Sequence, residues 1–223
     1  MTGLSVIDMG NHEKLIIFVK APVAGKVKTR LAPPLTLEQA CELYRSWAQD
    51  TYETGRLLNN VHLEIAYDAH VDFPTPNWLS RESRDISFFR QRGKSLGERL
   101  IHAFKQAFQN GAERVVIIGS DSPGLPISYI LEAFESLRNN NFVIGPTEDG
   151  GFYLIGFHNK VVPEVFRNVE WSTSNVFSMT MQNTRNIYLS THILPGYFDI
   201  DRPEDLLRLE ARSLRMRGRP VKA

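Results

Sequence analysis

The sequence predicts a single α/β domain in which helices flank a mainly parallel central sheet. Short apolar runs of strand-forming residues alternate with longer segments whose apolar residues recur at helical spacing. No repeat, low-complexity tract or linker divides the chain, and its 223 residues fit one domain of this class. We expect the domain to extend over residues 14–210, with flexible tails at 1–13 and 213–223.

The composition is that of an ordinary globular protein, with 42% hydrophobic and 23% charged residues. A formal charge of +1 creates no overall attraction to nucleic acid or membranes, so any basic patch must be local. The one cysteine, Cys41, excludes an internal disulfide and fits a reducing compartment. The sequence shows no signal peptide and no run of the ~18 apolar residues that a membrane span needs, which predicts a cytoplasmic protein.

Local signals place the elements in chain order. Strands are predicted at 15–19, 62–67, 86–90, 115–118, 142–144 and 153–155, with late strands at 187–189 and 192–194. Helices are predicted at 36–58, 95–108, 127–138, 161–167, 175–182 and from 202 on, with one helical turn at 76–81. Two helices begin with capping boxes, Thr36 with Gln39 and Ser95 with Glu98. A hydroxyl residue is expected to cap the helix at 175–182: Ser172, Thr173 or Ser174.

The strand at 115–118 is the centre of the predicted site. It runs into Gly119, Ser120 and Asp121, and open parallel sheets bind their ligands at the carboxyl ends of strands. A carboxylate in that place suits a hard divalent cation and, through it, a phosphate. The alternative is that Asp121 closes the turn or caps the next helix, because aspartate is an ordinary turn residue.

The loop after the first strand, residues 20–31, is rich in cations. It holds Gly25 and four basic residues, Lys20, Lys26, Lys28 and Arg30. A strand followed by a glycine turn and clustered Lys and Arg is typical of a phosphate-binding loop. The loop is neither a Walker A sequence nor Gly-x-Gly-x-x-Gly. A solvated basic turn is the alternative, but the position directly after a buried strand favours phosphate binding.

A second candidate segment lies between the strands at 142–144 and 153–155. Glu148 and Asp149 precede two adjacent glycines, Gly150 and Gly151. This pattern indicates either a backbone that approaches a ligand closely or a hairpin turn. Further along the chain, Trp171 could stack on a sugar or base, or belong to the core.

Asp199 and Asp201, one residue apart, form a third candidate segment just before the last helix. In an extended segment both side chains would face the same side. Either could complete a metal site with Asp121. The alternative is that Asp201 serves only as the N-cap of the last helix.

Five motifs in this order resemble the nucleotide-diphospho-sugar transferase superfamily, which has a glycosyltransferase-A, Rossmann-like fold. They are Lys20-Ala-Pro to Lys28-Thr-Arg-Leu31, Gly119-Ser-Asp-Ser-Pro123, Gly145-Pro to Asp149-Gly-Gly-Phe-Tyr-Leu-Ile-Gly156, Trp171-Ser-Thr173 and Asp199-Ile-Asp-Arg-Pro-Glu-Asp-Leu206. Within the superfamily the chain is most similar to a bacterial family grouped with arsenosugar-biosynthesis glycosyltransferases. It is more distantly similar to phospholactate guanylyltransferase and the molybdenum-cofactor nucleotidyltransferases. It departs from them in having one glycine in the first loop, and Ser-Asp-Ser where many glycosyltransferases have Asp-x-Asp.

The resemblance implies a role for each of these segments. The nucleotide would bind Lys20, Ala21, Pro22, Gly25, Lys26, Lys28, Thr29, Arg30 and Ser120. Mg²⁺ or Mn²⁺ would bind Asp121 and Asp201, with Asp199 as the other candidate for the second carboxylate. The sugar or acceptor would face Gly150, Gly151, Trp171, Ser172 and Thr173. Catalysis would involve Asp149, Glu148 and Lys28.

The sequence therefore predicts a metal-dependent transferase that joins a nucleotide-activated donor to a small-molecule acceptor. A nucleotide-sugar glycosyltransferase is favoured, because an acceptor hydroxyl needs a base and the loop with Glu148 and Asp149 offers one. The alternative is a nucleotidyltransferase, which would transfer a guanylyl or cytidylyl group to a phosphorylated acceptor that needs no base. A nucleotide-binding protein without catalytic activity is the third hypothesis, because the central motif has a single acid.

Overall fold

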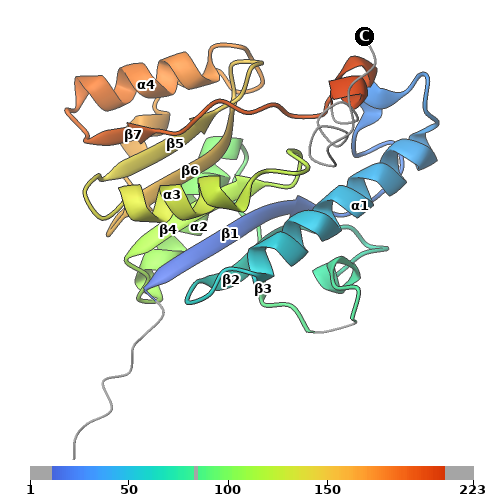
Figure 1. Ribbon diagram of the computed structural model, residues 1–223, viewed down its shortest axis with the longest axis horizontal. Helices are drawn as coiled ribbons and strands as arrows, with labels where there is room; N and C mark the ends of the chain where they lie inside the picture. Colours follow the sequence, from blue (N-terminus) through green and yellow to red (C-terminus); the bar gives the residue numbers. More distant parts are fainter. Residues whose placement is uncertain (1–11, 83–84, 209–223) are drawn as a thin grey trace, which may run out of the picture.

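The computed structural model describes residues 12–82 and 85–208 (Figure 1). One seven-stranded sheet has the order β3-β2-β1-β4-β6-β5-β7. Its strands are β1 (Glu13–Lys20), β2 (His62–Asp68), β3 (Phe88–Arg90), β4 (Arg114–Gly119), β5 (Phe142–Pro146), β6 (Phe152–His158) and β7 (Thr191–Ile193). The helices are α1 (Leu37–Arg56), α2 (Leu96–Gln109), α3 (Ile127–Ser136) and α4 (Val176–Asn186), with 3-10 helices η1 (Thr29–Leu31), η2 (Pro76–Leu79) and η3 (Pro163–Phe166). Residues 203–208 are also helical.

The domain predicted at 14–210 falls almost wholly within the described residues. Of the tail predicted at 1–13, only His12 and Glu13 are described, and Glu13 begins β1 rather than belonging to a tail. The tail predicted at 213–223 lies outside the described residues.

The predicted mainly parallel sheet is confirmed. Strand β1 pairs in parallel with β2 and β4, β2 pairs in parallel with β3, and β5 pairs in parallel with β7. Strand β6 is the exception and runs antiparallel to both β4 and β5. Only the short turn at 147–151 joins β5 to β6, and so short a connection can link antiparallel neighbours but not parallel ones.

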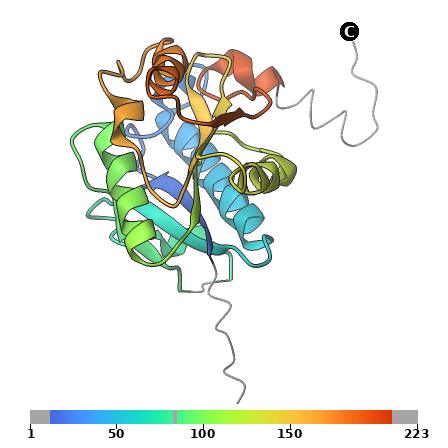
Figure 2. The same cartoon turned by 90° about the vertical axis from the view of Figure 1, so that its left-hand side faces the viewer.

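Helices cover both faces of the sheet, as predicted. Helices α1 and α3 pack on one face against alternate residues of β1, including Leu15 and Ile17. Helices α2 and α4 pack on the other face (Figure 2), and the intervening Ile16 belongs to the apolar layer on that face. This alternation follows from the two-residue period of a strand and places one apolar layer on each side. Within the described part of the chain, no helix is both long and apolar enough to cross a membrane.

Three elements predicted between residues 161 and 189 differ from those in the structure. Helix α4 continues past the predicted end to Asn186, and the strand expected at 187–189 is the turn that ends it. Tyr188 has φ 54 there, a left-handed conformation that an extended strand does not allow. The helix expected at 161–167 is the shorter 3-10 helix η3, which begins at Pro163.

The predicted helix caps are only partly confirmed. Thr36 and Gln39 form the complete capping box of α1. The Ser95 hydroxyl accepts from Glu98 N, but the Glu98 carboxylate accepts from Lys94 N instead of completing the box. No side chain caps α4. The predicted cap Thr173 lies two residues before the N-cap Asn175, where its hydroxyl accepts from Asn175 N and donates to Glu170 O.

The cap of α1 provides a direct test of local stability. Replacing Thr36→Ala removes the acceptor for Gln39 N, which lies 3.2 Å from the hydroxyl. We expect the free energy of unfolding to fall by about 1 kcal/mol in urea denaturation. Ser46→Ala, at an exposed position within the same helix, should leave stability equal or slightly higher because alanine is the better helix former. Equal losses in both variants would contradict the capping role.

Candidate functional site

A cavity of about 1050 Å³ lies at the edge of the sheet where β1 and β4 end and β6 begins. Its lining comes from the first loop, the end of β4, the β5–β6 turn, the start of α2 and segments at 171–176 and 198–208. The predicted site residues at the cavity are Lys20, Lys26, Lys28, Thr29, Arg30, Ser120, Asp121, Glu148, Asp149, Gly151, Trp171, Ser172, Thr173, Asp199 and Asp201. Segments far apart in the chain thus meet at the place where an open sheet binds ligands.

Four of the predicted site residues do not line the cavity. Ala21 and Pro22 are buried at the start of the first loop, where Ala21 N donates to Asp68 O at 2.9 Å. Gly25 supplies φ 78 to the loop, and Gly150 supplies φ 87 to the β5–β6 turn. These residues shape the chain on either side of the cavity.

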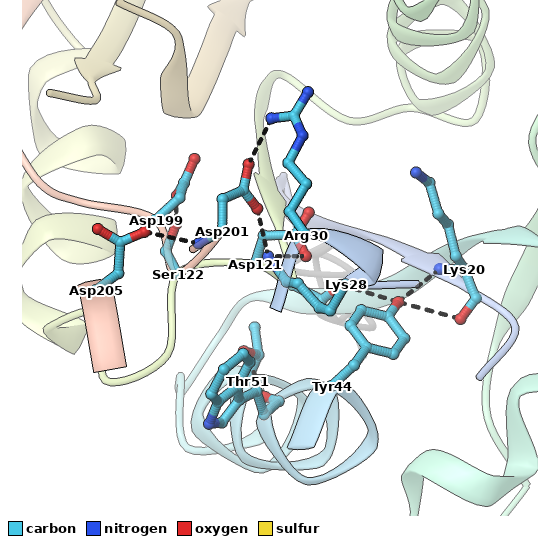
Figure 3. A network of polar contacts seen from close by, with 12 residues as sticks. Lys20, Lys28, Arg30, Tyr44, Thr51, Asp121, Ser122, Asp199, Asp201 and Asp205 are labelled. Atoms are coloured by element: carbon cyan, nitrogen blue, oxygen red, sulfur yellow. Dashed lines mark hydrogen bonds and ion pairs between the residues drawn. The ribbon is translucent and has the colours of Figure 1, made fainter. Parts of the chain in front are cut away.

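Lys28 is the centre of the site. Its Nζ lies 2.9 Å from Oδ1 of Asp121 and 2.9 Å from Oδ1 of Asp201, so it bridges the two carboxylates (Figure 3). The Lys28 side chain is 4% exposed, compared with 51% for Asp121 and 42% for Asp201. Arg30 approaches Asp201 from outside at 3.6 Å. The acid that shares the Lys28 ammonium with Asp121 is therefore Asp201.

The ionisation of this cluster follows from burial and charge together. Burial alone would lower the pKa of Lys28, but the facing carboxylates of Asp121 and Asp201 outweigh it and raise the pKa above its ordinary value. Burial raises the pKa of Asp201, and the Lys28 ammonium more than reverses this, so the net pKa is lowered. Both groups are charged at neutral pH.

The backbone of Lys28 adopts a conformation that is unusual for a residue with a side chain. Its φ of 48° and ψ of 35° are left-handed, and the residue precedes η1. Such strain persists only when surrounding contacts hold it in place. Here Val27 and Leu31 are buried on either side of Lys28, whose ammonium is fixed by the two ion pairs.

Neither alternative role suggested for the two acids as helix caps is observed. Helix α3 starts after Pro126 with no side-chain cap, so Asp121 does not cap it. At the last helix, the Asp205 carboxylate accepts from Asp201 N at 3.1 Å and from Arg202 N at 2.8 Å. The carboxylate of Asp201 is left to face Lys28.

Asp199 has a different environment from Asp201. It accepts a hydrogen bond from the Ser122 hydroxyl. Burial raises the pKa of Asp199 to about 6, and the nearby Asp121 carboxylate adds to the rise while Ser122 and Lys28 oppose it. Ile200, between the two acids, is fully buried and its N donates to Asp121 O at 3.3 Å. The segment is thus fastened beside the end of β4, with both acids on its cavity side.

The acidic loop is a hairpin turn that also lines the cavity. Asp149 Oδ1 accepts from the Thr147 hydroxyl at 2.5 Å and from Gly151 N at 3.0 Å. Glu148 pairs with Arg208 at 2.7 Å. The hairpin alternative is therefore correct for the backbone, and a catalytic role for these acids stays a prediction.

The β5–β6 turn is docked onto the segment at 171–175. Gly150 O accepts from Phe177 N at 2.8 Å, and a Cβ atom at Gly150 would overlap the Ser174 carbonyl oxygen. Trp171 packs between Phe152 and Phe166 at centroid distances of 6.3 and 6.1 Å. Trp171 therefore has the predicted core role in part, while one side of it lines the cavity.

Sequence reasoning missed two groups of residues. The buried Tyr44 hydroxyl accepts from Lys20 N at 2.8 Å and lies 3.2 Å from Ser120 Oγ, so α1 holds the ends of β1 and β4 together. Burial raises the pKa of Tyr44 far above its ordinary value, so the hydroxyl stays neutral. Gln91 and Arg99 also line the cavity. Gln91 directly follows the strand predicted at 86–90, and polar residues at the ends of parallel strands are expected at a ligand site. This position could have identified Gln91 from the sequence.

The charges of the lining are divided between its two sides. On the side of β1, β2 and β3 the charged residues are basic apart from the acids paired with Lys28: Lys20, Lys26, Lys94 and Arg99. On the side of β5 and β6 the charged residues of the turn are acidic, Glu148 and Asp149, and Arg208 pairs with Glu148. Asp199, Arg202 and Asp205 belong to the segment after β7, which packs against the first loop and α1 through Ile200 and Leu206. Lys28 lies between these sides, next to Asp121 and Asp201.

The chain is similar to known proteins in both sequence and structure. Residues 52–173 match the model of a family described as uncharacterized protein conserved in bacteria, DUF2064. A crystal structure from Desulfovibrio desulfuricans G20, of a protein provisionally named a nucleotide-diphospho-sugar transferase, is 35% identical. Its TM-score is 0.82, over 91% of this chain and 87% of that one. This likeness confirms the predicted fold. No match is found among curated proteins.

Two more distant structures share the fold alone. The 4-diphosphocytidyl-2C-methyl-D-erythritol synthase from Anaerococcus prevotii DSM 20548 is 13% identical, with a TM-score of 0.60 over 91% of this chain and 99% of that one. A CMP:2-keto-3-deoxy-manno-octonic acid synthetase in complex with CTP is 12% identical, with a TM-score of 0.54 over 92% and 98% of the two chains.

Asp199 predicts a pH dependence of stability. Because its pKa is raised, the folded state binds this proton more tightly than the unfolded state does. The free energy of unfolding should therefore fall by about 2 kcal/mol as pH rises from about 4 to about 6, relative to Asp199→Asn. Urea denaturation at several pH values measures this difference. Asp201→Asn is the control of opposite sign, because the pKa of Asp201 is lowered and its stabilisation is lost as pH falls.

The contact between the two loops predicts a difference between two glycines. Gly150 and Gly111 have nearly the same φ, 87° and 88°, but a Cβ atom at Gly111 would meet nothing within 4 Å. Gly111→Ala should cost about 1–2 kcal/mol of backbone strain. Gly150→Ala should cost a further 1–3 kcal/mol, roughly, because the loops must separate. Equal unfolding free energies of the two variants would show that the contact at Gly150 is not tight.

Proposed function

This chain belongs to the DUF2064 family, and from that premise we propose that it is a transferase that uses a nucleotide-activated donor. The observation that carries the proposal is the Lys28–Asp121–Asp201 cluster with Arg30 beside it, at the ligand-binding edge of the sheet. The cavity of about 1050 Å³ is at the upper end of the range for small-molecule sites, which suits a donor together with an acceptor. The name given to the Desulfovibrio relative supports the same class of donor.

The basic side of the cavity is the proposed place of the donor. Lys20, Lys26, Lys94 and Arg99 line it, and charge-assisted hydrogen bonds from such side chains are strong ligands for phosphate oxygens. Lys28 and Arg30 stand where the basic side meets the acids. In this position they would stabilise negative charge as it develops on a leaving phosphate group.

The acids suit a divalent cation that arrives with the donor. Among the described residues, no group of three or more His, Cys, Asp or Glu side chains is arranged to hold a metal ion. Mg²⁺ in nucleotide sites is usually bound by only one or two carboxylates, with phosphate oxygens and water completing its shell. Asp121 and Asp201 fit that pattern and would hold Mg²⁺ or Mn²⁺. When bound, the cation would supply charge neutralisation at the leaving phosphate group.

The acidic side of the cavity favours glycosyl transfer. A phosphorylated acceptor would meet Glu148, Asp149 and Asp199 there, whereas a neutral hydroxyl acceptor would find carboxylates able to take its proton. Asp149 is held in the turn through Oδ1, so its carboxylate has a fixed place at the cavity. We therefore propose a nucleotide-sugar glycosyltransferase in which Asp149 or Glu148 serves as base.

A specific observation keeps nucleotidyl transfer as the second candidate. Arg208 lines the cavity beside Glu148, Arg202 lines it as well, and both would be the cations for an acceptor phosphate. In that case an acceptor phosphate oxygen would attack the α-phosphate of a nucleoside triphosphate, and pyrophosphate would leave. The acceptor, the grouping with arsenosugar-biosynthesis enzymes and a cytoplasmic location stay predictions.

Thermal melts against nucleoside triphosphates, nucleoside diphosphates and nucleotide sugars test the proposal, each with Mg²⁺, Mn²⁺ or a chelator. A nucleotide sugar at ~100 times its dissociation constant should raise the melting temperature by roughly 5–10 °C when metal is present. Asp121→Asn should abolish the metal-dependent part of the shift.

The control is Asp50→Asn, which removes an exposed acid that pairs with Arg81 away from the cavity. It should leave the ligand-induced shift unchanged. A shift confined to triphosphates would replace glycosyl with nucleotidyl transfer. A metal-dependent shift without turnover of any acceptor would favour a binding protein, and no shift at all would contradict the proposed donor class.

A further inference from the structure

Lys28 occupies the space between the two acids that would hold the divalent cation of the donor. We propose that Lys28 is an internal counter-ion that competes with divalent cations for Asp121 and Asp201 and releases these acids only when donor phosphates arrive. The inference rests on the proposed function, because it concerns how the same site takes up its cation. It predicts that metal and phosphate bind as a coupled pair.

The first step is that the carboxylate oxygens of Asp121 and Asp201 cannot bind the Lys28 ammonium and a divalent cation at the same time. Oδ1 of Asp121 and Oδ1 of Asp201 each lie 2.9 Å from Lys28 Nζ, so a single ammonium bridges them. A divalent cation bound to those oxygens would lie within a few ångströms of the ammonium, where repulsion between like charges is strong. Lys28 must therefore leave these oxygens before a divalent cation can bind them.

The second step is that Lys28 cannot leave without a new partner. Its side chain is 4% exposed, and a charged group buried to this degree is costly unless it is paired. A metal ion alone would take both carboxylates and leave the ammonium buried without an anion. Phosphate oxygens of a donor would provide that anion, since ammonium groups bind them through charge-assisted hydrogen bonds.

No neighbouring cation of the first loop is both buried and paired with the two acids. Arg30 is 66% exposed and lies 3.6 Å from Asp201, so its ion pair is screened by solvent. The Lys26 ammonium contacts His70 Nε2 at 3.0 Å and is exposed. Lys28 alone in this loop combines burial with contacts to both acids.

Coupling between the two ligands is the measurable consequence. If phosphate must replace the carboxylates as the partner of Lys28, bound phosphate increases metal affinity, and by linkage bound metal increases phosphate affinity to the same degree. Removing the ammonium should weaken the coupling in both directions. The acids would then take up the metal without help, while phosphate would lose one of its cations.

Mn²⁺ binding to the full chain tests the inference. Ultrafiltration separates protein-bound Mn²⁺ from free Mn²⁺ and from its complex with pyrophosphate, which serves as the probe for donor phosphates. The wild type should bind Mn²⁺ alone weakly and at least about tenfold more tightly with pyrophosphate. Lys28→Met should bind Mn²⁺ alone at least about tenfold more tightly than the wild type, with a smaller effect of pyrophosphate. Lys105→Met removes an exposed ammonium of α2 outside the cavity lining, and it should leave Mn²⁺ binding with and without pyrophosphate unchanged.

Two outcomes would overturn the inference. One is tight binding of Mn²⁺ alone by the wild type, with no gain from pyrophosphate. The other is a folded Lys28→Met variant that binds Mn²⁺ no more tightly than the wild type. The wild-type comparison stands without the variant if Lys28→Met does not fold. If the melts show no nucleotide binding but Lys28→Met still gains affinity for Mn²⁺, the donor class is wrong and the counter-ion role is retained.

Discussion

The ion pairs of one buried ammonium hold together the parts of the chain that form the site. Lys28 joins the first loop to the end of β4 through Asp121, and to the segment after β7 through Asp201. Lys28 and Asp201 are 173 positions apart in the sequence. This contact fixes both the left-handed residue Lys28 and the segment that carries Asp201. The same ion pairs therefore stabilise the site and hold the ammonium ready for an anionic ligand.

The direction of β6 decides what else can reach that cluster. Because β6 returns antiparallel beside β5, their short turn carries Glu148 and Asp149 to the edge where β1 and β4 end. A parallel connection would need a long crossover and would leave no acidic turn at this edge. The order of the sheet then separates the basic lining near β1 to β3 from the acidic lining near β5 and β6. Donor and acceptor sides of the proposed reaction follow from that separation.

Local patterns in the sequence predicted more of this structure than long-range contacts did. The apolar run at 115–118, the cations of the first loop and the Thr36 capping box are signals within a few residues, and all three locate elements correctly. The strand expected at 187–189 was wrong because apolar residues that follow a helix can also form its terminal turn. The meeting of Asp121 and Asp201 was expected, but the Lys28 bridge between them and the role of Tyr44 could not be predicted, since both depend on which segments become neighbours.

The tight contact of Gly150 with Ser174 has a consequence for how such a chain can diversify. The hairpin turn and the segment at 171–175 meet through backbone atoms, so neither can change length or path by itself. Grafting a foreign hairpin would require transplanting its matching segment as well. New acceptor preferences should therefore arise through paired replacement of both segments, or through side-chain exchanges such as those at Ser172 and Thr173 that leave both backbones in place.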